Sequence, residues 1–130
     1  KRVWINQDKC RRRMNKRELG TIKEQLAAAF LIEKGYEIID KNFRGRQGEI
    51  DLVAMKDKEI HFVEVKYRKN TAYGYPAEAV DYRKQFKICK VSDYYRLTHP
   101  TLHECGCHYA VIAILGEELL LYSDAFEYQF

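Results

Sequence analysis

Two short stretches, Gly48-Glu-Ile-Asp-Leu-Val-Ala54 and Ile60-His-Phe-Val-Glu-Val-Lys-Tyr67, determine how this chain is expected to fold. Both are rich in β-branched and aromatic residues, which favour strands. The segment between them, Met55-Lys-Asp-Lys-Glu59, has the composition of a turn. The sequence therefore predicts an antiparallel hairpin from residue 48 to residue 67.

The charged residues of this hairpin are spaced so that they would meet. Counting outward from a turn centred in the connecting segment places Asp51 opposite Glu64 and Glu49 opposite Lys66. Directly opposed Cβ atoms on antiparallel strands are about 4.5–5.5 Å apart, and side chains alternate between the two faces of a strand. Three carboxylates and one ammonium are therefore expected on one face.

Facing carboxylates destabilise a hairpin unless a cation lies between them. Magnesium is typically held by one or two carboxylates together with water and substrate phosphates, so Asp51 and Glu64 are candidate ligands of Mg²⁺, with Mn²⁺ as the alternative ion. The simpler alternative is a solvated strand face on which Lys66 pairs with Glu49 or Glu64. The largely apolar residues around the four charges argue against it, because they are typical of a sheet buried on both faces.

The segments on either side of the hairpin supply helices and further strands. Residues 18–34 carry apolar side chains at helical spacing, and a helix that begins at Thr21, with Glu24 in a capping box, is an alternative boundary. Residues 36–43 are expected to form a strand and residues 78–97 a second helix, in which Phe86, Cys89 and Tyr94 recur near the helical period. Residues 109–115 and 118–122 resemble a closing pair of strands.

Length and composition predict one globular unit behind a basic arm. The 130 residues are 46% hydrophobic, which is enough for a core without metal or disulfide staples. Residues 1–16 form the expected arm and residues 17–130 the domain; within residues 1–17, eight Lys or Arg residues stand against the single acidic residue Asp8. Such an arm is typical of phosphate binding or of a solvated extension.

Several classes of protein are disfavoured by the composition. No apolar stretch is long enough to span a membrane, and the basic opening segment lacks the apolar core of a secretory signal. Four scattered cysteines fit a reduced, cytoplasmic setting. Two of them lie in His103-Glu-Cys-Gly-Cys-His108, where a second ligand pair at zinc-site spacing is missing, so a loop is favoured over a metal site there.

Two segments next to the charged residues favour contact with nucleic acid. Arg44-Gly-Arg-Gln-Gly48 is expected to be a mobile cationic loop, and Tyr67-Arg-Lys-Asn-Thr-Ala-Tyr-Gly-Tyr-Pro76 interleaves cationic with aromatic side chains. Arginine and aromatic rings stack on bases while cations follow the backbone, although tyrosine is also common at ordinary surfaces. The candidate nucleic-acid-binding residues are Arg44, Arg46, Tyr67, Arg68, Lys69 and Tyr73.

A series of short motifs resembles the YraN-like family of uncharacterised proteins, within the PD-(D/E)xK, or restriction-endonuclease-like, superfamily. The motifs run between residues 15 and 122 in the order of that family. They are Gly20-x-x-x-Glu24-x-x-Ala27, Gly35-Tyr36, Asn42-Phe-Arg44, Gly48-Glu-Ile-Asp-Leu52, Phe62-Val-Glu-Val-Lys-Tyr-Arg68, Gly74-x-Pro76-x-x-Ala-Val80 and Lys84-Gln85.

The resemblance implies an α/β fold with an αβββαβ core, in which helices flank a central mixed sheet. It implies that Asp51 and Glu64 bind metal, that Lys66 lies beside the scissile phosphate and that Glu24 reaches the site from the first helix. Glu49 belongs to the family motif without an assigned role, and Lys84 and Gln85 resemble second-helix residues that face the phosphate in related resolvases.

These features favour a metal-dependent endonuclease that acts on DNA, including branched or single-stranded forms. A binding module that keeps the fold without cutting is the alternative, and a scaffold subunit that forms a homodimer through a sheet edge is a third. The presence of Asp51, Glu64 and Lys66 together favours the enzyme, because facing carboxylates repel the phosphates that a simple binder must hold.

Overall fold

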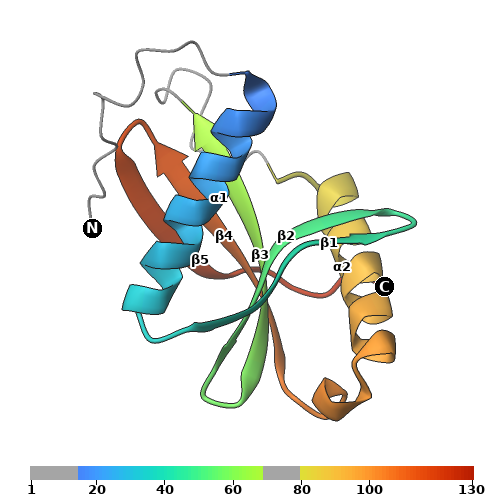
Figure 1. The fold of residues 1–130 in the computed structure, drawn as a ribbon. Helices are drawn as coiled ribbons and strands as arrows, with labels where there is room; N and C mark the ends of the chain where they lie inside the picture. The colour runs from blue at the N-terminus through green and yellow to red at the C-terminus, as the bar shows by residue number, and fades with distance from the viewer. Residues whose placement is uncertain (1–14, 69–79) are drawn as a thin grey trace.

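The computed structural model describes residues 15–68 and 80–130, which form two helices, a short 3₁₀ turn and one five-stranded sheet (Figure 1). In chain order the elements are α1 (Lys16–Glu33), β1 (Glu37–Gly45), β2 (Gly48–Lys56), β3 (Glu59–Arg68), α2 (Tyr82–Thr98), the 3₁₀ turn η3 (Pro100–Leu102), β4 (Cys107–Leu115) and β5 (Glu118–Phe126). Within these ranges neither helix is long and apolar enough to span a lipid bilayer.

The strands lie in the order in which they occur in the chain. β3 and β4 are parallel, and the other neighbours are antiparallel. Parallel neighbours require a crossover connection, and this one contains α2. The arrangement confirms the predicted mixed α/β fold: an αβββαβ core, with β5 added at the edge next to β4.

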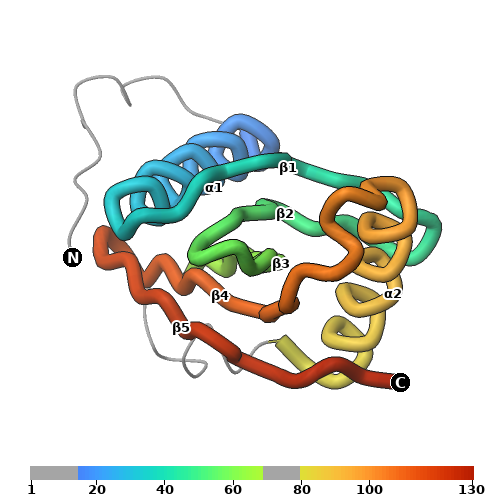
Figure 2. The backbone as a smooth tube through the Cα atoms, turned by 90° about the horizontal axis from the view of Figure 1, so that it is seen from below, coloured from blue at the N-terminus to red at the C-terminus, as the bar shows by residue number. Residues whose placement is uncertain are grey.

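The two helices cover opposite faces of the sheet and create two cores (Figure 2). α1 packs Ala27 and Leu31 against Leu52 and Val63, and α2 packs the face that carries Phe62. The central strands β2, β3 and β4 are therefore apolar on both sides, as the sequence indicated. A charged side chain in these strands is withdrawn from water unless it lies where the sheet opens.

The hairpin between β2 and β3 has the predicted register. Asp57 and Lys58 both have positive φ (53° and 64°), as a two-residue type I′ turn requires. Pairing then runs from Lys56 opposite Glu59 to Leu52 opposite Val63. The expectation that Asp51 and Glu64 continue this ladder is wrong, because the paired region ends before them.

Three predicted boundaries differ from the structure. The segment 44–48 is the turn of a tight β1–β2 hairpin, in which Gly45 pairs with Gly48, rather than a loop. α2 begins at Tyr82, after the cap residue Asp81 accepts a hydrogen bond from the Lys84 backbone N–H (2.9 Å), and β5 continues to residue 126. Residues 1–14 of the predicted arm lie outside the described residues, and α1 begins at Lys16 after the cap residue Asn15.

The buried faces of the helices are rotated from the predicted apolar stripes. α1 buries Lys23, Ala27 and Leu31, and it does not begin at Thr21, whose hydroxyl donates to the Arg17 carbonyl within the helix (3.1 Å). Small alanine side chains let the helix approach the sheet closely, and the long lysine stem packs with its ammonium over the Tyr67 ring. On α2 the predicted stripe fails more clearly: Phe86 is 40% exposed.

An imidazole joins three elements at the end of the sheet near the β2–β3 turn. His108 on β4 is held between Glu59 on β3 and Asp124 on β5, with Nδ1 2.7 Å from the Asp124 carboxylate, and it stacks on His61 at 4.6 Å between ring centroids. The hydrogen bonds to Glu59 and Asp124 raise the pKa of His108, while burial, followed by the charge of His108, lowers the pKa of His61. The His108 ring therefore ties the edge strand to the interior of the sheet through its two carboxylate partners.

Replacing His108 by Gln is expected to destabilise the protein by about 1 kcal/mol at pH 6 and by less at pH 9. A raised histidine pKa stabilises the fold below the unfolded value of 6.5, and this contribution is lost as the pH rises through the higher folded value. Urea unfolding at the two pH values measures the difference. His103→Gln, on the exposed segment after η3, is the matched control, and an equal loss for His108→Gln at both pH values would contradict the expectation.

Candidate functional site

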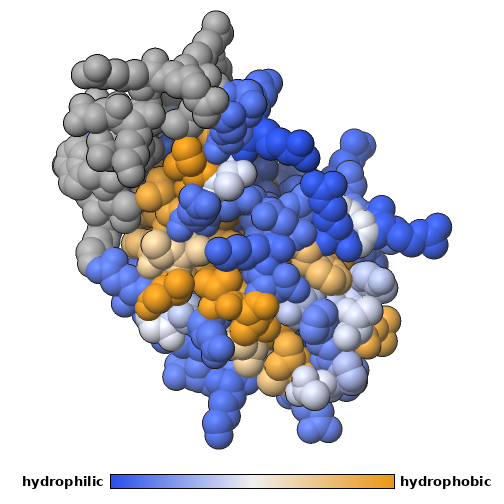
Figure 3. Space-filling view, in the orientation of Figure 1, coloured by the Kyte–Doolittle hydropathy of each residue, from blue (hydrophilic) through white to orange (hydrophobic). Residues whose placement is uncertain are grey.

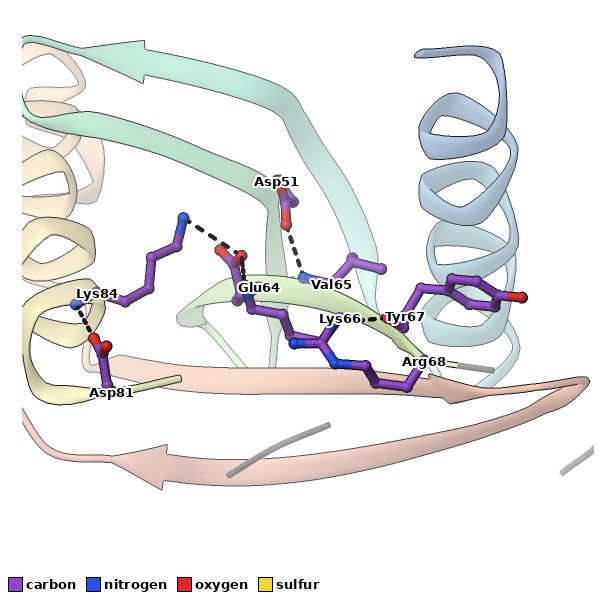
Figure 4. A network of polar contacts seen from close by, with 8 residues as sticks. All are labelled: Asp51, Glu64, Val65, Lys66, Tyr67, Arg68, Asp81 and Lys84. Atoms are coloured by element: carbon purple, nitrogen blue, oxygen red, sulfur yellow. Dashed lines mark hydrogen bonds and ion pairs between the residues drawn. The ribbon is translucent and has the colours of Figure 1, made fainter. Parts of the chain in front are cut away.

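The site forms where β2 and β3 separate. Beyond Leu52 and Val63 the two strands are no longer paired, and the carboxylate of Asp51 enters the gap. The backbone N–H of Val65 donates to Asp51 Oδ2 at 2.8 Å, which fixes the direction of the carboxylate (Figure 4). The carboxylate thus occupies the position that a strand partner would take in a continuous sheet.

Glu64 approaches the same gap from β3 with both cations of the site beside it. The ammonium groups of Lys66 and Lys84 each lie 3.6 Å from Glu64 Oε1 (Figure 4). The residue is only 5% exposed, and its second oxygen, Oε2, is buried with no hydrogen-bond partner in the part of the chain that the structure describes. A buried carboxylate oxygen in that state favours a cation.

A second group of carboxylates shares Asp51. Oxygen atoms of Glu24 on α1, Glu49 on β2 and Asp51 all lie within 4.8 Å of one another. Glu49 has one further partner, the Arg44 guanidinium, whose Nε is 3.4 Å away. Oxygen ligands at this spacing suit a hard divalent ion. From the sequence, Glu24 was assigned to the site only by the family resemblance.

Three carboxyl groups of the site, those of Glu24, Asp51 and Glu64, have raised pKa values. Burial, followed by the charge of Asp51, raises the pKa of Glu64 to about 7. Burial also raises the pKa of Asp51 and of Glu24, and the charge of Asp51 adds to the effect on Glu24. Each anion is costly here without a cation, so a divalent ion would be bound by groups that gain from its charge.

Open space adjoins these groups on the α1 side of the sheet. A cavity of about 310 Å³ is lined by Asp51 and Glu64, by α1 residues that include Lys23 and Glu24, and by Tyr67 on β3. Glu24 and Asp51 are only partly buried. The volume is enough for an ion with its water ligands and the edge of a substrate, so the carboxylates can be reached from outside.

Two residues of the site were not recognised from the sequence. Asn42 has positive φ (51°), a conformation that asparagine tolerates, and its amide donates to the Glu24 carboxylate. Lys23 is 5% exposed and places its ammonium 4.1 Å from the centroid of the Tyr67 ring. Asparagine is unusual in a strand-like run, so the sequence could have identified Asn42 as a residue of the site. Lys23, in contrast, resembled an ordinary solvent-facing residue.

The predicted nucleic-acid contacts are dispersed around the site. Arg44 and Arg46 lie at the β1–β2 hairpin, while Tyr67 packs against the α1 core beneath Lys23. Arg68 donates to the Tyr67 carbonyl (2.8 Å), and Lys69 and Tyr73 lie outside the described residues.

The two predicted second-helix residues have different surroundings. Lys84 enters the site through Glu64. Gln85 instead donates to the Val80 carbonyl (3.0 Å) and accepts from Gln129 (3.2 Å), so it ties the start of α2 to the C-terminal segment.

The Cys-x-Cys-His segment is not among the groups of potential metal ligands that the described residues bring together. Within residues 15–68 and 80–130, the carboxylates of Glu24, Glu49 and Asp51 are the group of three or more potential ligands close enough to share an ion. Cys105 and Cys107 are free thiols, and burial raises the pKa of Cys107. The loop reading of this segment agrees with the structure, in which Cys107 begins β4.

Comparison with known proteins gives one family. The model of "Uncharacterised protein family UPF0102" matches residues 23–114. A UPF0102 protein of Lachnoclostridium phytofermentans is 42% identical over 88% of this chain and 97% of its own length. UPF0102 proteins of Caldicellulosiruptor bescii (50% identical, over 66% of this chain and 72% of the relative) and Fusobacterium nucleatum (41%, over 82% and 88%) are also similar. The matched region contains every residue of the carboxylate site.

Proposed function

This chain belongs to the uncharacterised protein family UPF0102, which confirms the YraN-like resemblance, and from that premise we propose that it is a divalent-metal-dependent nuclease that hydrolyses phosphodiester bonds in DNA. The names of the relatives state no activity, so the site must support the proposal. The observation that carries it is the Glu64 carboxylate: both lysines contact its Oε1, while its Oε2 is buried without a partner among the described residues.

In this proposal Asp51 and Glu64 hold Mg²⁺ or Mn²⁺, and Glu24 and Glu49 extend the set of oxygen ligands. Glu24, Glu49 and Asp51 offer carboxylate oxygens at a spacing that a hard ion bridges, and burial disfavours the uncompensated charge of Asp51 and Glu64. When bound, the ion would supply an activated water and polarise a phosphoryl oxygen. It would also neutralise carboxylates that otherwise repel the phosphate.

The remaining work falls to residues of the chain. Lys66 is positioned by Glu64 with its side chain 23% exposed, so its ammonium can face a phosphate and offset the negative charge that grows on it during attack. Lys84 can hold a neighbouring phosphate from the α2 side of the gap. The Val65 N–H keeps the Asp51 carboxylate in place, and Asn42 orients Glu24.

A cleavage assay tests this proposal directly. Labelled duplex, single-stranded and four-way DNA are incubated with the purified protein and Mg²⁺ or Mn²⁺, with a chelator as the blank. Cutting that requires the metal supports the nuclease. Salt-sensitive binding without cutting of any substrate would overturn it in favour of the non-catalytic binding module.

A further inference from the structure

One face of α2 exposes aromatic side chains to solvent. Tyr82, Phe86 and Tyr94 are 74%, 40% and 50% exposed. Together with Lys90 they recur every four residues, so they form a stripe that winds slowly along the helix; we name these four residues the α2 stripe. The opposite face, with Ile88, Val91 and Tyr95, packs on the sheet. The exposed rings are therefore available to a partner.

The charge around the α2 stripe selects an anionic partner. The helix carries five basic residues, Arg83, Lys84, Lys87, Lys90 and Arg96, against the single acidic residue Asp93. The Asp93 carboxylate already accepts a hydrogen bond from the Tyr128 hydroxyl at 2.6 Å. The Lys90 ammonium lies 5.1 Å from the Phe86 ring centroid and 5.9 Å from that of Tyr128, so cation and rings form one surface.

The β1–β2 hairpin encloses one side of this surface. A cavity of about 520 Å³ lies between the hairpin and α2, lined by Arg44 and Arg46 from the hairpin and by Lys90 and Tyr94 from the helix. Figure 3 shows hydrophilic side chains gathered over the hairpin and the adjoining part of α2. Arginine side chains therefore lie across from an exposed ring, with room for a flat group between them.

The first turn of α2 carries both the start of the α2 stripe and one residue of the carboxylate site. Lys84, two residues after Tyr82, contacts Glu64 through its ammonium. From Tyr82 to Tyr94 the helix rises by about 18 Å, which at about 3.4 Å per nucleotide corresponds to about five nucleotides. A strand lying along the α2 stripe would thus have one end at the helix turn that carries Lys84.

We propose that the α2 stripe binds single-stranded nucleic acid, with bases stacked on Tyr82, Phe86 and Tyr94 and phosphates held by Lys90 and the hairpin arginines. The inference rests on the proposed function and specifies its substrate: nucleic acid with a single-stranded segment. Stacked bases inside a duplex offer no free ring faces to these residues, whereas an unpaired strand does. A purely apolar protein partner would leave the concentrated positive charge uncompensated.

Fluorescence anisotropy of a labelled oligothymidylate, titrated with protein in chelator so that no cleavage occurs, tests the proposal. Tyr82→Leu and Tyr94→Leu remove the ring and keep apolar bulk, and each is expected to weaken binding at least about fivefold, with about 25-fold for the double variant. Tyr82→Phe/Tyr94→Phe, which keeps both rings, is the matched control and should bind like the parent. Binding to a blunt duplex should change less than about twofold in all variants.

Unchanged oligothymidylate binding by the double Leu variant would overturn the proposal, and so would an equal loss of affinity for the duplex. A third contrary result is a dimer, detected by sedimentation of the parent, that the double Leu substitution dissociates. That result would assign the α2 stripe to self-association. The outcome is separable from the proposed function. Stripe-dependent binding without metal-dependent cutting upholds the inference and removes the nuclease. Unimpaired cutting of single-stranded DNA by the double Leu variant removes the inference and leaves the nuclease.

Discussion

Asp51→Asn is expected to lower metal-dependent DNA cleavage about a thousandfold while the protein stays folded. Asparagine is nearly the same size and keeps an oxygen that can accept the hydrogen bond from the Val65 N–H. It removes the negative charge that Asp51 contributes both to the gap beside Glu64 and to the group with Glu24 and Glu49. Initial rates on the best substrate of the cleavage assay, at saturating Mg²⁺ or Mn²⁺, measure the loss.

The matched control is Asp57→Asn, on the turn of the same hairpin. Asp57 is exposed, and its positive φ is tolerated by asparagine, so the two substitutions differ in little except their distance from the gap. The control should retain the parent rate. Cleavage by Asp51→Asn at the parent rate would show that the activity arises elsewhere in the protein or from a contaminant.

Glu64→Gln is expected to abolish cleavage as well but to make the metal-free protein more stable above pH 7, by about 2 kcal/mol, or about 5–10 °C in Tm. The pKa of Glu64 rises from 4.5 in the unfolded chain to about 7 in the fold, chiefly through burial. Between these values the folded protein binds more protons than the unfolded chain, so its stability falls as the pH rises. A neutral glutamine removes that loss.

Thermal unfolding of the parent and Glu64→Gln at pH 5 and pH 8, with and without Mn²⁺, measures this effect. The variant's advantage should be larger at pH 8, and Mn²⁺ should raise the Tm of the parent more than that of the variant, which keeps the carboxylates of Glu24, Glu49 and Asp51. Glu118→Gln, an exposed carboxylate at the start of β5, serves as the control with little change. A variant that is less stable than the parent at pH 8 without metal would mean that Glu64 is satisfied by its lysines alone.

Sequence alone predicted the elements and the register of the central hairpin because short-range rules govern both. The alternation of apolar residues in β2 and β3 and the composition of the turn at Asp57-Lys58 placed Leu52 opposite Val63 correctly. The residue at which the β2–β3 pairing ends could not be predicted from these short-range rules. It depends on the Asp51 carboxylate accepting the Val65 N–H, a contact between side chain and backbone that strand periodicity does not encode.

The helix faces and the composition of the acidic group depended on tertiary packing. Residues 86 and 94 follow the helical period as well as buried Cys89 does, yet the sheet selects Ile88, Val91 and Tyr95 and leaves the other aromatic rings in water. Glu24 had a local explanation as a capping residue, and only the approach of α1 to β2 brings it to Asp51. Local helix and strand propensities predict neither the buried face of α2 nor the position of Glu24 beside Asp51.

Beyond Leu52 and Val63 the separation of β2 and β3 leaves an opening between the two strands. Glu24 reaches this opening from α1 on one face of the sheet and Lys84 from α2 on the other, so in the proposed nuclease groups carried by opposite faces would act on one substrate. The acidic group on α1 and the basic group on α2 can therefore be altered independently, while β2 and β3 keep the carboxylates of Asp51 and Glu64 in place. Substitutions in α2 and the neighbouring β1–β2 hairpin could therefore change the substrate preference without any change in the carboxylates.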